Sequence, residues 1–296
     1  MLLIDASVYI FRAFHALPDS ITGAGGRPLN AVHGYVGFLA GVLAVTDEKR
    51  VAAAFDESLT GSFRNAFFAD YKANREQPPA DLVDQIGACR AITEALGVAT
   101  LSSPRYEADD LIATLATLAK GAGEPVTVVT SDKDLAQILG DDDTLWDYAR
   151  ETRYDRAAIV ERFGVAPEAI PDYLALVGDT VDNIPGVPGI GAKTAAALLS
   201  CFSDIEAMLA DLDAVSAAPI RGAKSLVSRL EKHAAQARLS RRLASLVGDI
   251  DLDPDQRAIA RRAPDTVRLA ALCDELGAGP GLRRRLGLGQ AEGATP

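Results

Sequence analysis

Three short apolar segments that each lead into an aspartate constrain the fold of this chain most strongly. They are "LLID", which ends at Asp5, "VAAAFDES", which contains Asp56, and "PVTVVTSDKDL", which carries Asp132 and Asp134. Their apolar and β-branched residues predict short buried strands. Segments with helical periodicity lie between them, at residues 31–46, 81–97 and 107–123. Strands that alternate with helices predict an α/β fold, with a mainly parallel central sheet flanked by helices.

Further carboxylates extend this pattern. Sites in parallel α/β sheets form beyond the carboxyl ends of the strands, so we expect the strand-end aspartates to gather at one edge. The segment "YEADDLIA" adds a helical cluster, and the Gly-rich segment 178–199 opens with two more, so that the added carboxylates are Glu107, Asp109, Asp110, Asp179 and Asp182. Clustered carboxylates repel one another and cannot all stay ionised without cations. Oxygen ligands without His or Cys favour Mg²⁺ or Mn²⁺, and two such ions are a common device for phosphoryl displacement.

Several other phosphate-handling classes do not fit the residue spacing. A P-loop needs Lys directly after its last Gly, but Gly191 is followed by Ala192 before Lys193. A Rossmann loop needs a third Gly where this chain has Thr194. A phosphatase of the haloacid dehalogenase type would need Asp-x-Asp after the first strand, but this chain has Ser7 where the second Asp would stand.

The composition constrains the cellular compartment of the protein more than it constrains its function. The 296 residues carry a net charge of −11, which alone argues mildly against a nucleic-acid partner, but basic residues concentrate at 220–242. No apolar run approaches the roughly 20 residues of a membrane helix, and the N-terminus lacks the features of a signal peptide. Three well-separated cysteines without a CxxC pair are typical of free thiols in a reducing compartment. We therefore expect a cytoplasmic protein that does not enter a membrane.

The order of the motifs resembles a known family, the 5′ nucleases: the 5′→3′ exonuclease domain of bacterial DNA polymerase I, phage 5′ nucleases and flap endonucleases. The resemblance is strongest to the polymerase I branch and covers roughly residues 1–285. It rests on "LLIDASVYIFRAFHALP", "AAFDES", "SFRNAFFADYKANRE", "YEADDLIATLA", "VTVVTSDKDLAQIL" and "GDTVDNIPGVPGIGAKTAAALL", which occur in the family's order. No polymerase domain follows, so we expect a stand-alone nuclease.

The resemblance implies roles for particular residues. All nine carboxylates would form the family's metal-binding set: Asp5, Asp56, Glu107, Asp109, Asp110, Asp132, Asp134, Asp179 and Asp182. "DYKANRE" looks like the base of the family's helical arch, near residues 64–85. Lys72 and Arg75 would contact the scissile phosphate and the 5′ strand there, with Arg12 and Arg64 as further basic positions. A lone basic residue is more often only a surface charge, so the motif carries these assignments.

The resemblance also implies two domains, an α/β nuclease domain at residues 1–165 and a helical DNA-binding domain at 166–296. A helix-hairpin-helix would occupy 184–199 and grip the duplex backbone without reading sequence. Glycine amides can approach a phosphate closely, and the residues expected at the DNA are Gly186, Gly189, Gly191, Lys193, Thr194, Arg221 and Lys224. The family also holds a monovalent cation, commonly K⁺, on hairpin carbonyls.

The predicted function is a metal-dependent 5′→3′ exonuclease or flap endonuclease that leaves a 5′-phosphate and a 3′-hydroxyl. Expected substrates are DNA with a 5′ flap, nick or 5′ end, and RNA primers in RNA–DNA hybrids, in replication and repair. We expect a monomer. Two alternatives stay open: a DNA-junction binding protein that no longer cuts, and a PIN-type ribonuclease, which shares the acidic α/β pattern but is usually shorter and lacks a helix-hairpin-helix. The complete carboxylate set argues against the first, since buried unpaired charge is costly.

Overall fold

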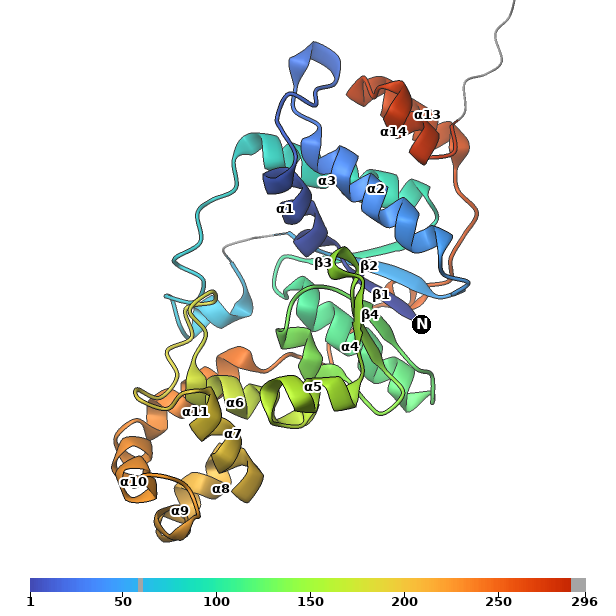
Figure 1. The fold of residues 1–296 in the computed structure, drawn as a ribbon. Coiled ribbons are helices and arrows are strands. Elements are labelled where there is room, and N and C mark those ends of the chain that lie inside the picture. Colours follow the sequence, from blue (N-terminus) through green and yellow to red (C-terminus); the bar gives the residue numbers. More distant parts are fainter. Residues whose placement is uncertain (58–60, 289–296) are drawn as a thin grey trace, which may run out of the picture.

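A six-stranded sheet forms the centre of the N-terminal half of the protein (Figure 1). The structure is a computed structural model that describes residues 1–57 and 61–288. The strand order is β3-β2-β1-β4-β5-β6, with β6 antiparallel to β5 and every other pair parallel. The strands are β1 (Leu2–Asp5), β2 (Val51–Asp56), β3 (Ala99–Ser103), β4 (Thr127–Val129), β5 (Thr144–Asp147) and β6 (Thr152–Tyr154). The predicted fold class, a mainly parallel sheet flanked by helices, is confirmed.

Side chains alternate between the two faces of the sheet, and each face buries a separate apolar layer. Leu2 and Ile4 of β1 belong to the layer under α1, α2 and α3, whereas Leu3 belongs to the layer with α4. The flanking helices are α1 (Ala6–Ala16), α2 (Asn30–Ala44), α3 (Ala80–Ala95) and α4 (Ala108–Gly121). The three predicted helical segments correspond to α2, α3 and α4 within a few residues.

The carboxyl edge of the sheet is set by aspartates that end strands. Asp5 closes β1 and also caps α1, because its carboxylate accepts a hydrogen bond from the Val8 amide at 3.3 Å. The parallel register sets Asp5 opposite Ala54, two residues before Asp56. The ends of the two strands therefore lie side by side, as the sequence predicted.

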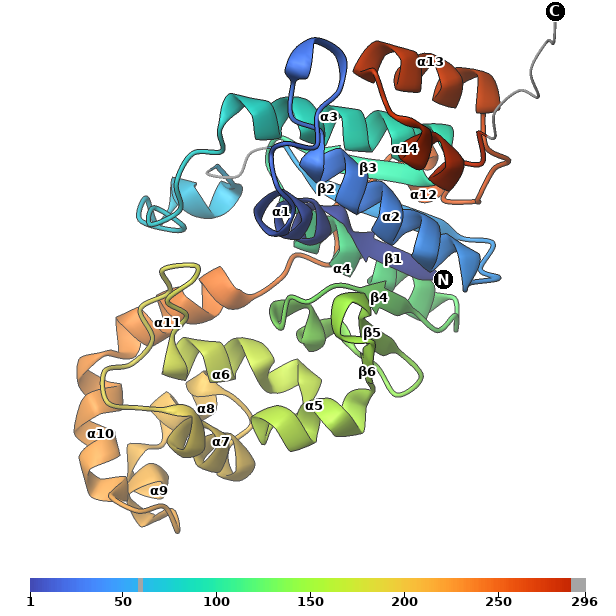
Figure 2. The ribbon, with the colours of Figure 1, turned by 45° about the horizontal axis from the view of Figure 1, so that its top comes forward.

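A helical region continues from the sheet below α4 (Figure 2). Its helices are α5 (Arg156–Phe163), α6 (Ile170–Val177), α7 (Ala192–Cys201), α8 (Ile205–Ala210), α9 (Leu212–Ala217), α10 (Ala223–Lys232) and α11 (Ala234–Ala244). The apolar layer under α4 extends without interruption through Ile159, Val165 and Ile170 into this region. The helical region is thus packed on the sheet rather than joined to it by a loose linker.

The chain then returns to the first half of the protein. Residue 260 pairs with Arg50 in an isolated bridge, and the Arg262 amide donates to the Gly97 carbonyl at 2.9 Å. The last helices are α12 (Pro254–Arg257), α13 (Thr266–Leu276) and α14 (Pro280–Arg285), and α13 and α14 lie beside α2 and α3 (Figure 1). The predicted second domain, 166–296, therefore includes a segment that packs on the first. Within the described residues, no helix has the length and apolarity needed to cross a bilayer.

Candidate metal and nucleic-acid site

Carboxylates from several elements meet at the carboxyl edge of the sheet. The Asp5 carboxylate accepts a hydrogen bond from Thr130 Oγ1 at 2.8 Å, which links the ends of β1 and β4. The Asp56 carboxylate accepts one from the Ala108 amide at 2.8 Å, which links the end of β2 to the start of α4. The structure therefore brings the strand-end aspartates and the first turn of α4 into one acidic cluster.

Burial and mutual repulsion perturb these carboxyl groups. Burial, followed by the charges of Asp56 and Asp132, raises the pKa of Asp5 to about 7. Burial and the neighbouring Asp132 charge likewise raise the pKa of Asp134 to about 7. Burial, Asp132 and Asp5 together raise the pKa of Asp109 well above its usual range. The cluster thus holds more negative charge than its surroundings stabilise, which is the electrostatic condition for binding cations.

The donor atoms of this cluster suit a hard divalent cation. All are carboxylate oxygens, the ligand type that Mg²⁺ and Mn²⁺ prefer. Asp134 Oδ1 is buried and, among the described residues, accepts no hydrogen bond. The Lys133 ammonium lies 3.4 Å from this oxygen, and the oxygen's unused hydrogen-bonding capacity fits an additional cation. In the present side-chain arrangement, no three carboxylates of residues 1–57 and 61–288 converge enough to enclose one ion.

Lysine and arginine side chains of the chain itself neutralise part of the cluster. Lys133 Nζ forms an ion pair with Asp179 and lies 3.4 Å from Asp134 Oδ1. Burial alone would raise the pKa of Asp179, but the Lys133 ammonium outweighs it and lowers that pKa. Lys133 was not among the predicted site residues. Its signal in the sequence is its position between Asp132 and Asp134.

Lys72 and Arg75 also lie at the carboxylates. Lys72 Nζ pairs with Glu107 and stands 3.6 Å from Asp182, and Arg75 Nη2 donates to Asp182 at 2.6 Å. The Tyr71 hydroxyl donates to Glu107 at 3.0 Å. Lys72 has a φ of 55°, a left-handed conformation that costs energy for a residue with a side chain. The backbone is therefore held in an unfavourable conformation at the point where this ammonium meets the cluster.

Arg64 and Asp110 are bonded to each other in the interior of the protein. Arg64 is 1% exposed, and Asp110 is fully buried. The guanidinium donates to both Asp110 oxygens at 2.8 Å, to Glu107 at 2.7 Å, and to the carbonyls of Leu243 and Ser245. The Val247 amide donates a further bond to Asp110 at 2.9 Å. The pair therefore joins α4 to the end of α11, and in this side-chain arrangement both Asp110 oxygens accept hydrogen bonds from protein groups.

The stretch predicted as a helical arch, 64–85, takes a different conformation. A 3₁₀ helix at Phe63–Ala66 is followed by turns through residue 75 and an extended segment, and α3 then begins at Ala80. Residues 69–79 are mostly polar and end in two prolines, Pro78 and Pro79, which do not favour a helix before α3. Arg12, on α1, is exposed. Burial raises the pKa of Tyr9, and the nearby Arg12 charge offsets a small part of that rise.

The segment predicted as a helix-hairpin-helix, 184–199, follows α6 and leads into α7, and its glycines differ in exposure. α6 ends at Val177 and α7 begins at Ala192. Gly186 is buried, and an added Cβ would lie 2.4 Å from the Gly178 amide nitrogen, so close packing requires a glycine at this position. Gly189 and Gly191 are exposed. The remaining predicted DNA contacts, all exposed or partly exposed, are Lys193, Thr194, Arg221 and Lys224.

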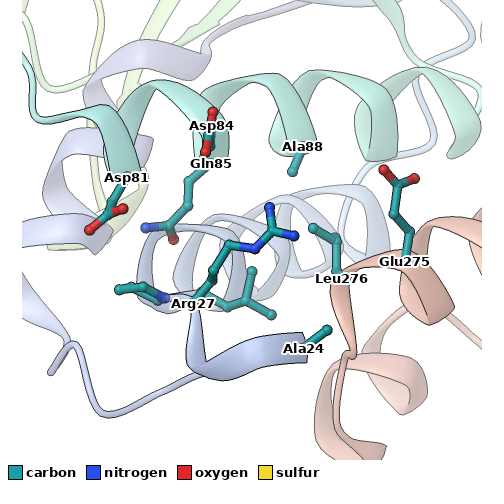
Figure 3. A pocket seen from close by; sticks show the side chains of 10 residues that line it. Ala24, Arg27, Asp81, Asp84, Gln85, Ala88, Glu275 and Leu276 are labelled. Carbon is teal, nitrogen blue, oxygen red and sulfur yellow. The ribbon is translucent and has the colours of Figure 1, made fainter.

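A separate small cavity lies away from the carboxylates (Figure 3). It has a volume of about 80 Å³ and is bounded by α3, α13 and residues 24–29. The Arg27 side chain extends between α3 and Leu276, and Asp84 and Glu275 line the rim (Figure 3). None of the predicted site residues lines this cavity, so it is not part of the acidic cluster.

Comparison with protein families supports the relation seen in the motifs. Residues 1–164 match the 5′-3′ exonuclease N-terminal resolvase-like domain, and residues 165–267 match the 5′-3′ exonuclease C-terminal SAM fold. DNA polymerase I of Pseudomonas aeruginosa is 42% identical over 277 residues, which cover 93% of this chain and 30% of that protein. A 5′-3′ exonuclease of Buchnera aphidicola is 33% identical over 254 residues, which cover 86% of this chain and 88% of that protein.

Solved structures share the same fold. The bacteriophage T5 5′-exonuclease with bound zinc superimposes with a TM-score of 0.68 at 18% identity, covering 97% of each chain. The catalytic core of Rad2 in complex with a DNA substrate gives a TM-score of 0.62 at 16% identity, covering 96% of this chain and 90% of that chain. At these identities the likeness concerns the fold.

Proposed function

The chain belongs to the 5′-3′ exonuclease family, and on that premise we propose that it is a divalent-metal-dependent 5′ nuclease acting on 5′ flaps, nicks and 5′ ends of DNA. It spans about 30% of the length of the polymerase I relative, so this proposal concerns the nuclease part alone. Cleavage leaves a 5′-phosphate and a 3′-hydroxyl. The bacterial relatives support action in the cytoplasm, and we expect a monomer.

One observation carries the proposal: a buried acidic cluster at the carboxyl edge of the sheet is short of positive charge. Burial and the neighbouring carboxylates raise the pKa values of Asp5, Asp109 and Asp134. The buried Asp134 Oδ1 accepts no hydrogen bond, although Lys133 Nζ lies 3.4 Å from it. A protein that only binds DNA gains nothing from such costly carboxylates. Divalent metal binding would compensate the charge and recover that cost.

In this proposal eight of the nine carboxylates bind metal, and Asp110 stabilises the fold through its ion pair with Arg64. The proposed ligand set is Asp5, Asp56, Glu107, Asp109, Asp132, Asp134, Asp179 and Asp182, without Asp110. Divalent ions at such a site make water a stronger nucleophile and stabilise charge on the leaving oxygen. A K⁺ ion at the hairpin remains a prediction. In this structure two hairpin carbonyls, those of Gly186 and Gly189, accept hydrogen bonds from the side chains of Gln236 and Arg229.

The basic residues would position the nucleic acid. Lys72 and Arg75, which pair with carboxylates here, would exchange part of that pairing for the scissile phosphate. Lys193 and the Gly189 and Gly191 amides would contact the duplex backbone, a contact that fixes position without reading sequence. Because these contacts do not read sequence, we also propose RNA primers in RNA–DNA hybrids as substrates.

A cleavage assay tests the proposal. Fluorescently labelled 5′-flap, nicked and RNA-primed duplexes are incubated with the protein in Mg²⁺, Mn²⁺ or EDTA. We expect short 5′ products with divalent metal and none in EDTA, and we expect Asp109→Asn to abolish cleavage while duplex binding persists. Asp213→Asn, on the exposed part of α9, is the matched control and should cleave like the wild type. Duplex binding without any metal-dependent product would favour the junction-binding alternative.

A further inference from the structure

A groove outside the carboxylate cluster combines aromatic rings with arginines. It has a volume of about 700 Å³ and lies between residues 61–67, the loop before α4 and the end of α11. Phe63, Phe67, Pro104, Arg105 and Arg242 line it, and we call it the aromatic groove.

The rings and guanidinium groups of the groove are arranged in contact. The Phe63 and Phe67 ring centroids are 6.2 Å apart, and Phe63 lies 5.5 Å from the Tyr106 ring. The Arg242 guanidinium stands 3.8 Å from the centre of the Phe67 ring, and that of Arg105 stands 5.3 Å from the centre of Tyr106. Phe63 and Phe67 are both partly exposed, although the Arg242 guanidinium covers one face of Phe67 and the Arg64 guanidinium lies 4.6 Å from the centre of the Phe63 ring.

The charge of the groove contrasts with the rest of the chain. Net charge is −11. Across the described part of the chain, neither Arg105 nor Arg242 has a carboxylate within salt-bridge distance. Partly exposed aromatic rings beside guanidinium groups that have no carboxylate partner are elements that bind single-stranded nucleic acid, because bases stack on the rings and on the guanidinium planes, and phosphates contact the cations.

The groove also adjoins the proposed catalytic cluster. Tyr106 immediately precedes Glu107 in the sequence, and Arg64, which lies between Phe63 and Phe67, bonds to Glu107 at 2.7 Å. One layer of side chains therefore separates the groove from the carboxylates.

From this geometry we propose that the aromatic groove binds the unpaired 5′ strand of a flap substrate. Phe63 and Phe67 stack with its bases, and Arg105 and Arg242 contact its phosphates. The proposal rests on the proposed function for the identity of the strand. Binding of single-stranded nucleic acid by the groove is independent of cleavage and can be measured without it.

The first test is binding of a fluorescein-labelled oligothymidylate of about ten nucleotides, a length within the usual range of single-strand sites. Fluorescence anisotropy is recorded in EDTA, so that no cleavage intervenes. We expect the double variant Arg105→Ala/Arg242→Ala to bind about 5-fold or more weakly than the wild type, and Phe67→Leu to bind more weakly as well. The matched control is Arg261→Ala/Arg262→Ala, which removes the same charge away from the groove. Equal affinity of the groove and control variants overturns the proposal.

The second test compares cleavage of duplexes with a one-nucleotide flap and with a ten-nucleotide flap. The groove double variant should lower kcat/KM by about 5-fold or more on the long flap and by less than about 2-fold on the short flap. Equal losses on both substrates overturn the proposal. If the wild type cuts neither substrate, the proposed function fails, and the anisotropy result alone then decides the groove. Thermal melting of each variant confirms that it is folded.

Discussion

Replacing Arg64 by methionine should destabilise the fold more than any other single change at the site. Methionine keeps much of the apolar stem but loses five hydrogen bonds, and it leaves the Asp110 charge buried without its partner. Breaking a buried ion pair on one side costs about 3–5 kcal/mol. At about 2–4 °C per kcal/mol for larger chains, the melting temperature should fall by about 6–20 °C.

The measurement is equilibrium unfolding in urea together with thermal melting, both in EDTA. Arg75→Met is the matched control, because Arg75 is 38% exposed and Lys72 also faces Asp182, so its loss should cost less than about 1 kcal/mol. The double variant Arg64→Met/Asp110→Asn should be less destabilised than the sum of the two single variants, since the second change removes the stranded charge.

A different outcome would show that Arg64 contacts substrate after all. If Arg64→Met unfolds within about 1 kcal/mol of the wild type while cleavage is lost, the guanidinium acts on the nucleic acid rather than on the scaffold. Additive effects in the double variant would likewise contradict a direct Arg64–Asp110 coupling.

Three further predictions use the same measurements. Asp109→Asn should raise the melting temperature of the metal-free protein while abolishing cleavage, because its charge is repelled by Asp132 and Asp5; a lower melting temperature would contradict this. In EDTA, the free energy of unfolding should fall as pH rises from about 4 to about 7, since the folded pKa values of Asp5 and Asp134 lie above their ordinary value of 3.8 and the folded chain holds more protons in that window. Excess Mn²⁺ should offset this loss at about pH 7.5, as followed by differential scanning fluorimetry. Gly186→Ala should lower the melting temperature markedly, because φ is 61° and the added Cβ would lie 2.4 Å from a backbone nitrogen; the control Gly191→Ala, which meets nothing within 4 Å, should change it little.

The sequence was sufficient for the strands that carry the carboxylates. Apolar runs such as residues 2–4 and 51–55 are buried on both faces, so each run is nearly continuous and ends sharply at its aspartate. β3, β5 and β6 were not predicted. β6 is three residues long and only partly buried, which leaves little pattern to detect.

The roles of Arg64, Asp110 and Lys133 could not be predicted from sequence. Arg64 and Asp110 lie 46 positions apart, and nothing local indicates that they pair in the interior. Two adjacent aspartates look equivalent in "EADD", yet Asp109 joins the acidic cluster and Asp110 turns to the α11 side of α4. The helical rotation between neighbouring residues, about 100°, turns Asp109 toward the acidic cluster and Asp110 toward Arg64 and Val247.

The return of the chain to the sheet after α11 has a mechanical consequence. The helical region leaves the α/β half through α5 and re-enters it through the residues around Val247, so it is attached at both ends and not on one hinge. A module with two attachments, which also shares a continuous apolar layer with its host, cannot unfold or swing as an independent body. The spacing between the hairpin at residues 184–191 and the acidic cluster is therefore set by the architecture itself.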